Sequence, residues 1–304
     1  MTDHTDWPPL PGHDRFAYSP IRQRAPSRWP GGQQLAVYLG LNSEHFAFGA
    51  GLGAALGPVS PQPDVLNYMW REYGNRVGVW RCLDLFDDLQ LPAGALVNTA
   101  LYDHCPEVIQ ACAARGDEII AHGHSNAERQ GGWPQEQEAR LLAHCRARIE
   151  RESGHAPGGW LSPWISESLH TPDLLAEAGY RYTLNWCHDD QPVAVRTRGG
   201  QRLWSIPYPQ ELNDIPMVIA RQMDAADFAQ MVIDQFDEML EQAHRPSRPQ
   251  ALVMGIALHP YIMGQPYRIR HLRRALRHIA AHRADIWLTT PGAICDAMDA
   301  RAPG

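Results

Sequence analysis

Two histidines follow an apolar run, and their position makes them candidates for chemistry. The run covers residues 119–121, and His122, His124 and Asn126 come directly after it. In α/β folds, catalytic groups gather just beyond the carboxyl ends of buried strands. Imidazoles at such a point can bind a metal, transfer a proton or hold a polar substrate. The alternative is that they are surface histidines, because the chain has 15 of them.

Similar polar residues follow other apolar runs. Glu44 comes shortly after the run at 35–41, and His259 follows the run at 251–258. If these runs are parallel strands, their carboxyl ends meet at one face of the fold. We therefore predict an active site there, with Glu44, His122 and His259 as its catalytic residues. The alternative is that connecting loops are polar in any protein.

Each of these groups has a plausible role in hydrolysis. A carboxylate in a cleft can take a proton from water, so Glu44 is the candidate base. His259 is the candidate acid that protonates a leaving nitrogen, and His122 would polarise a carbonyl or bind a metal. The structural alternatives are an exposed Glu44 and a core His259 bonded to backbone. Asp214 is expected to be a solvated loop acid.

A second set of residues is predicted to bind the substrate. Trp133, Trp164 and Tyr208 could form walls around a flat ring, although each could equally serve packing. Asn213 offers a donor and an acceptor together, which matches the edge of an amide. His124 completes the predicted substrate-binding set.

Strand-like and helix-like segments alternate along the whole chain. Strands are predicted at 35–41, 95–97, 118–121, 160–161, 180–186, 203–206, 251–258 and 286–288. Helices are predicted at 75–89, 105–115, 134–153, 171–179, 224–242 and 267–282, and from 291 onward. This alternation predicts an α/β fold, an irregular (β/α) barrel of seven to eight mainly parallel strands. We expect residues 1–33 to be an extended arm, residues 34–304 a single domain, and 49–63 a lid or a disordered loop.

Composition excludes several classes of partner. The formal charge of −7 and a pI near 6.1 argue against nucleic acid or an anionic membrane. The six cysteines form no C-x-x-C pair, which is typical of free thiols in a reducing compartment. No signal peptide and no apolar run of ~20 residues is evident, so we expect a cytoplasmic protein.

Four local motifs resemble a known family. They are LNSE at 41–44, EYGNRVGVWR at 72–81, EIIAHG at 118–123 and LHPYIMGQP at 258–266. Together they resemble the polysaccharide deacetylase superfamily with the NodB-homology fold, in its allantoinase and cyclic-imide-hydrolase branch. The resemblance extends roughly from residue 28 to residue 298. It implies the barrel described above, and a homo-oligomer (a dimer or a tetramer).

The chain departs from the sugar deacetylases of this superfamily at their metal-binding positions. Those enzymes use an Asp-Asp pair after the first strand and an H-x-x-x-H metal pair. Here Asn42 and Glu44 occupy the first region, and Asn126 replaces the second histidine after His122. The resemblance therefore leaves two alternatives open. One divalent metal, with zinc as the first candidate, is held by Glu44, His122 and Asn126, or no metal is bound, as in some members of the imide branch.

The function expected from residues and resemblance together is hydrolysis of a C–N bond. The substrate would be a small cyclic amide or imide of the allantoin, hydantoin or succinimide class. One alternative is a metal-dependent deacetylase of an N-acetylated sugar or a related amide. Another is a non-catalytic binding protein that has lost its catalytic residues.

Overall fold

The computed structural model describes residues 10–58, 62–245 and 249–301, and its centre is one curled sheet. Its strands are β1 Leu35–Ser43, β2 Ala93–Val97, β3 Glu118–Ala121, β4 Gly159–Trp160, β5 Tyr182–Thr183, β6 Val193–Val195, β7 Leu203–Ser205, β8 Leu252–Leu258 and β9 Trp287–Leu288. They lie in the order β6-β7-β5-β4-β3-β2-β1-β8, with β9 beside β1, and only β6 and β7 pair antiparallel. The irregular, mainly parallel (β/α) barrel is confirmed. The missed strand, β6, is three residues long and partly exposed, so it carries little apolar signal.

Within the described residues, loop segments connect β8 to the far side of the sheet. Asn213 forms an isolated parallel bridge with Ala257, and the amide of Val253 donates to the carbonyl of Asp190 at 2.8 Å. The barrel is therefore closed by loops at this point, which brings the segment around Asn213 next to the end of β8.

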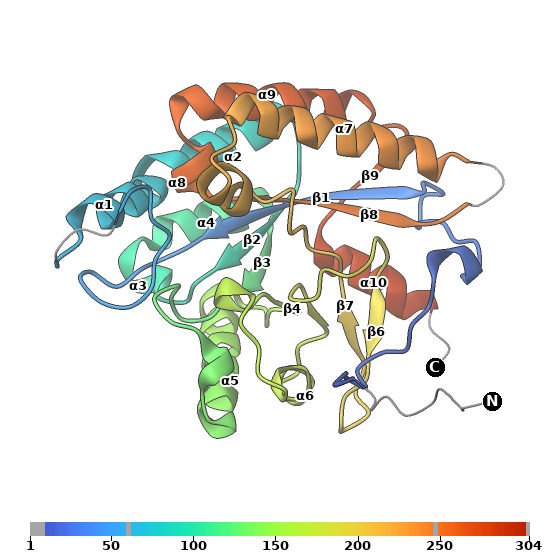
Figure 1. Cartoon of the computed structure of the whole chain (residues 1–304), viewed down its shortest axis with the longest axis horizontal. Coiled ribbons are helices and arrows are strands. Elements are labelled where there is room, and N and C mark those ends of the chain that lie inside the picture. The colour runs from blue at the N-terminus through green and yellow to red at the C-terminus, as the bar shows by residue number, and fades with distance from the viewer. Residues whose placement is uncertain (1–9, 59–61, 246–248, 302–304) are drawn as a thin grey trace, which may run out of the picture.

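Helices cover the sheet. They are α1 Val65–Tyr73, α2 Val79–Asp88, α3 Leu101–His104, α4 Pro106–Arg115, α5 Gln135–Ser153, α6 Thr171–Glu177, α7 Ala225–Ala243, α8 Pro260–Met263, α9 Pro266–Ala281 and α10 Pro291–Arg301. Figure 1 shows α7 and α9 packed together on the side of β1 and β8. None of the helices in the described ranges is long and apolar enough to span a membrane.

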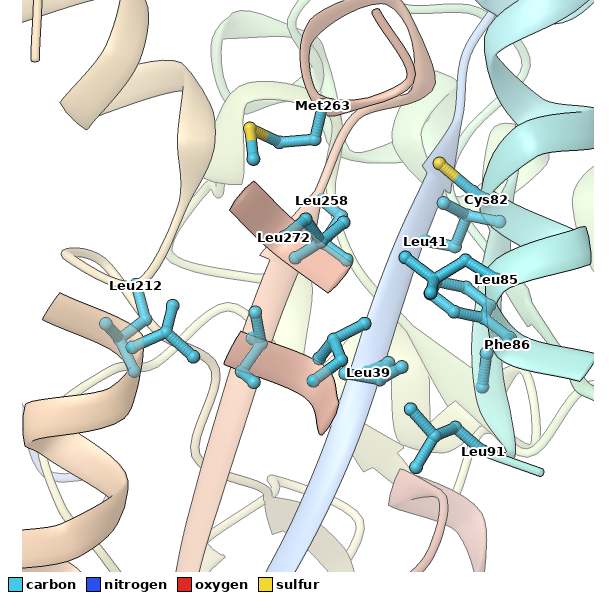
Figure 2. Close-up of a cluster of buried hydrophobic side chains, with 14 of the residues drawn as sticks. Leu39, Leu41, Cys82, Leu85, Phe86, Leu91, Leu212, Leu258, Met263 and Leu272 are labelled. Carbon is cyan, nitrogen blue, oxygen red and sulfur yellow. The ribbon is translucent and has the colours of Figure 1, made fainter. Parts of the chain in front are cut away.

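β1 and β8 form the rigid centre of the fold. Every residue of both strands is buried, as expected for parallel strands covered on both faces. Figure 2 shows Leu39 and Leu41 of β1 beside Leu258 of β8, with side chains of α2 next to them. Leu41 and Leu258 are register partners. The residues that follow the two strands therefore emerge at the same edge of the sheet.

The segment predicted as one helix at 75–89 is more complex. α1 and α2 are joined by a π-helix at Gly74–Gly78, which comes from the EYGNRVG motif. A Cβ on Gly78 would lie 2.1 Å from the carbonyl oxygen of Pro260, and one on Gly74 would lie 2.7 Å from the amide nitrogen of Tyr261. The two glycines therefore allow this turn to pack directly against the start of α8, next to His259.

The described part of the N-terminal arm, residues 10–33, has little regular structure beyond the short 3-10 helix Ile21–Gln23. It is held by two ion pairs, Arg15 with Asp173 at 2.6 Å and Arg24 with Asp189 at 2.5 Å. Residues 1–9 lie outside the described residues. The division into an arm and a single domain remains a prediction.

Candidate active site

A pocket of about 200 Å³ opens at the carboxyl ends of the central strands. Its lining includes seven of the predicted site residues: Glu44, His122, Asn126, Trp164, Tyr208, Asn213 and His259. Two predicted residues lie elsewhere. The exposed His124 bonds the hydroxyl of Thr99 at 3.0 Å, and the half-buried Trp133 is not part of the lining.

Glu44 is buried at the bottom of the pocket, with 4% of its surface exposed. The Tyr261 hydroxyl donates to its Oε2 at 2.8 Å, and the Asn126 amide donates to its Oε1. The Nε2 atoms of His122 and His259 each lie 3.5 Å from Oε1. Burial alone would raise the pKa of Glu44, but the charge on His259 and the two imidazoles beside the carboxylate lower it to about 2. Glu44 is therefore an anion at neutral pH, not a surface charge.

His259 lies between two carboxylates. Its Nδ1 donates to Oδ1 of Asp214 at 2.5 Å, and its backbone amide donates to Oδ2 of the same residue at 2.8 Å. Burial lowers the pKa of His259, but the charges of Asp214 and Glu44 outweigh burial and raise it to about 10. His259 is thus an imidazolium with Nε2–H directed at Glu44.

The expectation that Asp214 is a solvated loop acid is wrong, because its side chain is fully buried. Burial raises the pKa of this carboxyl, and the contact with His259 opposes that rise. Asp214 orients and charges His259. The sequence signal for it was its place after β7, two residues beyond Leu212, but nothing distinguished it from neighbouring loop acids.

His122 has a defined tautomer when it is neutral. Its Nδ1 donates to the carbonyl oxygen of Leu161 at 2.7 Å, so Nε2 carries the lone pair. This buried Nε2 has no hydrogen-bond partner among the described residues. It can accept a hydrogen bond from a water beside Glu44. Polarisation of a carbonyl by donation from Nε2 would require a second proton on the ring.

Strained backbone holds the pocket wall in place. Gly123 has φ +70°, and a Cβ there would lie 2.5 Å from Cγ of Pro163. Trp164 and Ile165 both have positive φ, 62° and 52°, which is costly for bulky residues. The Trp164 indole donates to the carbonyl oxygen of Asn126 at 2.9 Å. These contacts hold Trp164, which forms part of the pocket wall, against residues 122–126.

The residues at the predicted metal position do not fit a zinc site. The amide of His45 donates to Oδ1 of Asn98 at 2.8 Å, which fixes the Asn98 amide group. Asn98 Nδ2 then donates to Oδ1 of Asn126 at 3.0 Å, so Asn126 presents its NH₂ group to Glu44. A metal would need the amide oxygen instead. Glu44 and His122 would remain as ligands, which is fewer than zinc sites use.

The loop at 49–58 covers one side of the pocket. The Leu52 amide donates to the carbonyl of Ala127 at 2.7 Å, and Arg71 donates to the carbonyl of Ala54 at 2.8 Å. Ala54 itself lines the pocket, and the Arg71 guanidinium lies 4.5 Å from the ring centroid of Phe46. The described part of this loop is therefore anchored beside the pocket, and its role as a lid remains a prediction. Residues 59–61 lie outside the described residues.

Comparisons with known proteins agree with this fold. Residues 68–183 match the family model described as polysaccharide deacetylase. The peptidoglycan deacetylase of Helicobacter pylori (strain ATCC 700392 / 26695) is 26% identical over 248 residues, 71% of this chain and 82% of that protein. A solved structure of a probable polysaccharide deacetylase from Pseudomonas aeruginosa PAO1 has a TM-score of 0.79 and 25% identity. It covers 91% of this chain and 94% of its own. Puue allantoinase has a TM-score of 0.78 and 26% identity over the same shares of the two chains.

These likenesses support a hydrolase that acts on C–N bonds. Within that class the chain is similar to the polysaccharide deacetylases, and the resemblance found in its motifs is confirmed.

Proposed function

We propose that this protein hydrolyses a ring C–N bond in a small cyclic amide or imide. The observation that carries the proposal is the contact between the Glu44 carboxylate and the His259 imidazolium at the bottom of the pocket, 3.5 Å apart. A general base and a general acid in mutual reach are what hydrolysis of an amide requires. The likeness to Puue allantoinase supports this substrate class.

The size and lining of the pocket also favour a small flat substrate. Its volume of about 200 Å³ lies below the ~300–1,000 Å³ of typical drug-sized sites. Trp164 and Tyr208 supply aromatic surface, and the loop at 49–58 covers one side. The Asn213 Oδ1 already accepts from the amide of Ile215 at 3.1 Å, so its NH₂ group is the part proposed to meet the substrate.

The proposed reaction needs no group beyond this chain and water. Glu44 accepts a proton from a water that His122 Nε2 helps to orient, and the water oxygen bonds to the ring carbonyl carbon. The His259 Nε2–H donates a hydrogen bond to the charge that develops. The C–N bond then breaks, and the ring nitrogen takes that proton from His259. Transfer of the proton from Glu44 to His259, across 3.5 Å, restores both groups.

Deacetylation of an N-acetylated sugar is the second candidate, because the matched family model and the H. pylori relative carry that name. The orientation of the Asn126 amide disfavours it, since a metal-dependent deacetylase needs a complete ligand set.

A substrate panel separates the candidates. Chelator-treated and zinc-loaded protein would be assayed on allantoin, hydantoin and succinimide and on N-acetylglucosamine oligomers. The proposal predicts ring opening by both preparations and no acetate release. Acetate release by the zinc-loaded protein alone would support the deacetylase. A rise in melting temperature with a ring compound but no turnover would support a binding protein. The predicted dimer or tetramer would be tested on the same samples by light scattering.

A further inference from the structure

A second group of potential ligands lies outside the catalytic pocket. His45, Glu72 and His104 each offer one ligand atom, and these atoms all lie within 4.8 Å of one another. His104 Nε2 is 2.9 Å from Oε2 of Glu72, and His45 Nδ1 is 3.9 Å from its Oε1. None of the three lines the pocket that contains Glu44. His45 follows Glu44 directly in the chain.

The surroundings leave this group short of partners. His45 Nδ1 is buried and has no hydrogen-bond partner among the described residues. An unpaired buried ring nitrogen is costly unless something binds to it. The two imidazole rings lie with centroids 4.2 Å apart at a tilt of 42°, and one nitrogen of each lies within 4 Å of the single carboxylate of Glu72. The catalytic proposal uses none of these three side chains, although Glu72 opens the EYGNRVGVWR motif.

We propose that His45, Glu72 and His104 bind one divalent metal ion, with zinc as the first candidate. Two imidazoles and a carboxylate are a common zinc ligand set, with water completing the tetrahedron. Zinc bonds of ~2.0–2.2 Å would place neighbouring ligand atoms about 3.3 Å apart. The present separations of 2.9 and 3.9 Å lie on either side of that value. Small side-chain movements would complete the geometry, and His104, 36% exposed, leaves the water position open to solvent.

Such an ion would connect three separate segments next to the active site. His45 follows β1, Glu72 lies in α1, and His104 ends α3. α1 and α3 lie on the left in Figure 1. Because Glu44 and His45 are adjacent, the ion would also fix the backbone that positions the catalytic carboxylate. Its role is structural, and the folded state would be stabilised in proportion to metal binding.

The test is metal binding to chelator-treated full-length protein, followed by Co²⁺ absorbance, by Zn²⁺ competition with a chromophoric chelator and by melting temperature. The wild type should bind one equivalent and melt at a higher temperature with metal. His104→Gln and Glu72→Gln should each weaken binding by more than about 100-fold, since loss of even an outer-shell partner typically costs 10–100-fold. Both should lose the metal-dependent rise in melting temperature.

Two matched variants locate the ion. His144→Gln changes a nearby histidine outside the group, and His122→Gln removes the imidazole beside Glu44. Both should keep one equivalent of bound metal. Circular dichroism of each metal-free variant shows whether it is folded. If His104→Gln is unfolded, Glu72→Gln still tests the site, because glutamine keeps the shape of the glutamate side chain. The proposal is overturned if wild type binds no equivalent, or if His122→Gln loses the metal while His104→Gln and Glu72→Gln retain it.

Discussion

The charge on His259 decides what this site can do at the scale of single residues. A neutral imidazole bonded through Nδ1–H to Asp214 would have no proton on Nε2 to give to a leaving nitrogen. The buried carboxylates of Asp214 and Glu44 keep the second proton on the His259 ring, and both contribute to raising the pKa of His259 to about 10. Asp214 is therefore a positioning residue that acts through His259.

Asp214→Asn should show this directly. With one carboxylate removed, the pKa of His259 falls from about 10 toward its ordinary value. The alkaline limb of the kcat/KM profile should then move to lower pH, with at least about a tenfold loss at neutral pH. Asp103→Asn, at an exposed acid paired with Arg148, is the control and should leave the profile unchanged. An unmoved alkaline limb in Asp214→Asn would contradict the role of Asp214.

Residue types at strand ends predicted much of this site. The sequence did not reveal the residues whose roles depend on how the loops are oriented in the fold. Glu44, His122 and His259 were predictable because each follows a buried apolar run. Asp214 was not, because its burial depends on the loop that lies beside β8. The role of Asn98 could not be inferred either, since it acts through a chain of hydrogen bonds between three loops.

At the scale of elements, the turn after β3 aims His122 into the pocket. Gly123→Ala should be more damaging than Gly116→Ala, although both glycines have positive φ, +70° and +81°. At Gly116 nothing lies within 4 Å of an added Cβ, so only left-handed backbone strain of about 1–2 kcal/mol is expected. At Gly123 the contact with Pro163 adds overpacking of about 1–3 kcal/mol.

Urea unfolding and ring-opening assays would check this pair of variants. Activity should fall in Gly123→Ala, because displacement of Pro163 moves both His122 and Trp164, and should persist in Gly116→Ala. Equal stability losses in the two variants, with equal activity, would argue against a positioning role for this turn.

Elements with a strong pattern were predicted well and the irregular ones were not. The fully buried β1 and β8 carry unbroken apolar runs, and α4 ends at Gly116 as its sequence indicates. The π-helix at Gly74–Gly78 was missed because its cause is tertiary: two glycines packed against α8.

At the scale of the whole molecule, the buried charges make stability depend on pH. The Glu44 pKa is lowered from 4.5 to about 2, so its contribution is complete above 4.5 and is lost as pH falls toward 2. The His259 pKa is raised from 6.5 to about 10, so its contribution is complete below 6.5 and is lost as pH rises through 10. Both contributions are complete between pH 4.5 and 6.5.

Glu44→Gln tests the acid side of this dependence, because glutamine resembles the protonated glutamic acid. The variant should melt below wild type at pH 5–6, and the difference should shrink as pH falls toward 2. Thermal denaturation followed by circular dichroism across this range measures it. A difference that stays constant with pH would mean that Glu44 is not held as an anion in the fold.

We propose that Glu44 and His259 open a ring without a metal in their pocket. The most direct measurement is kcat/KM for ring opening of the best panel substrate, in chelator, for wild type, Glu44→Gln and the exposed-site control Glu136→Gln. We expect activity in wild type and Glu136→Gln, and a loss of about 10²–10⁴-fold in Glu44→Gln. Near-normal turnover by Glu44→Gln, or wild-type activity that appears only when metal is restored to this pocket, would contradict it.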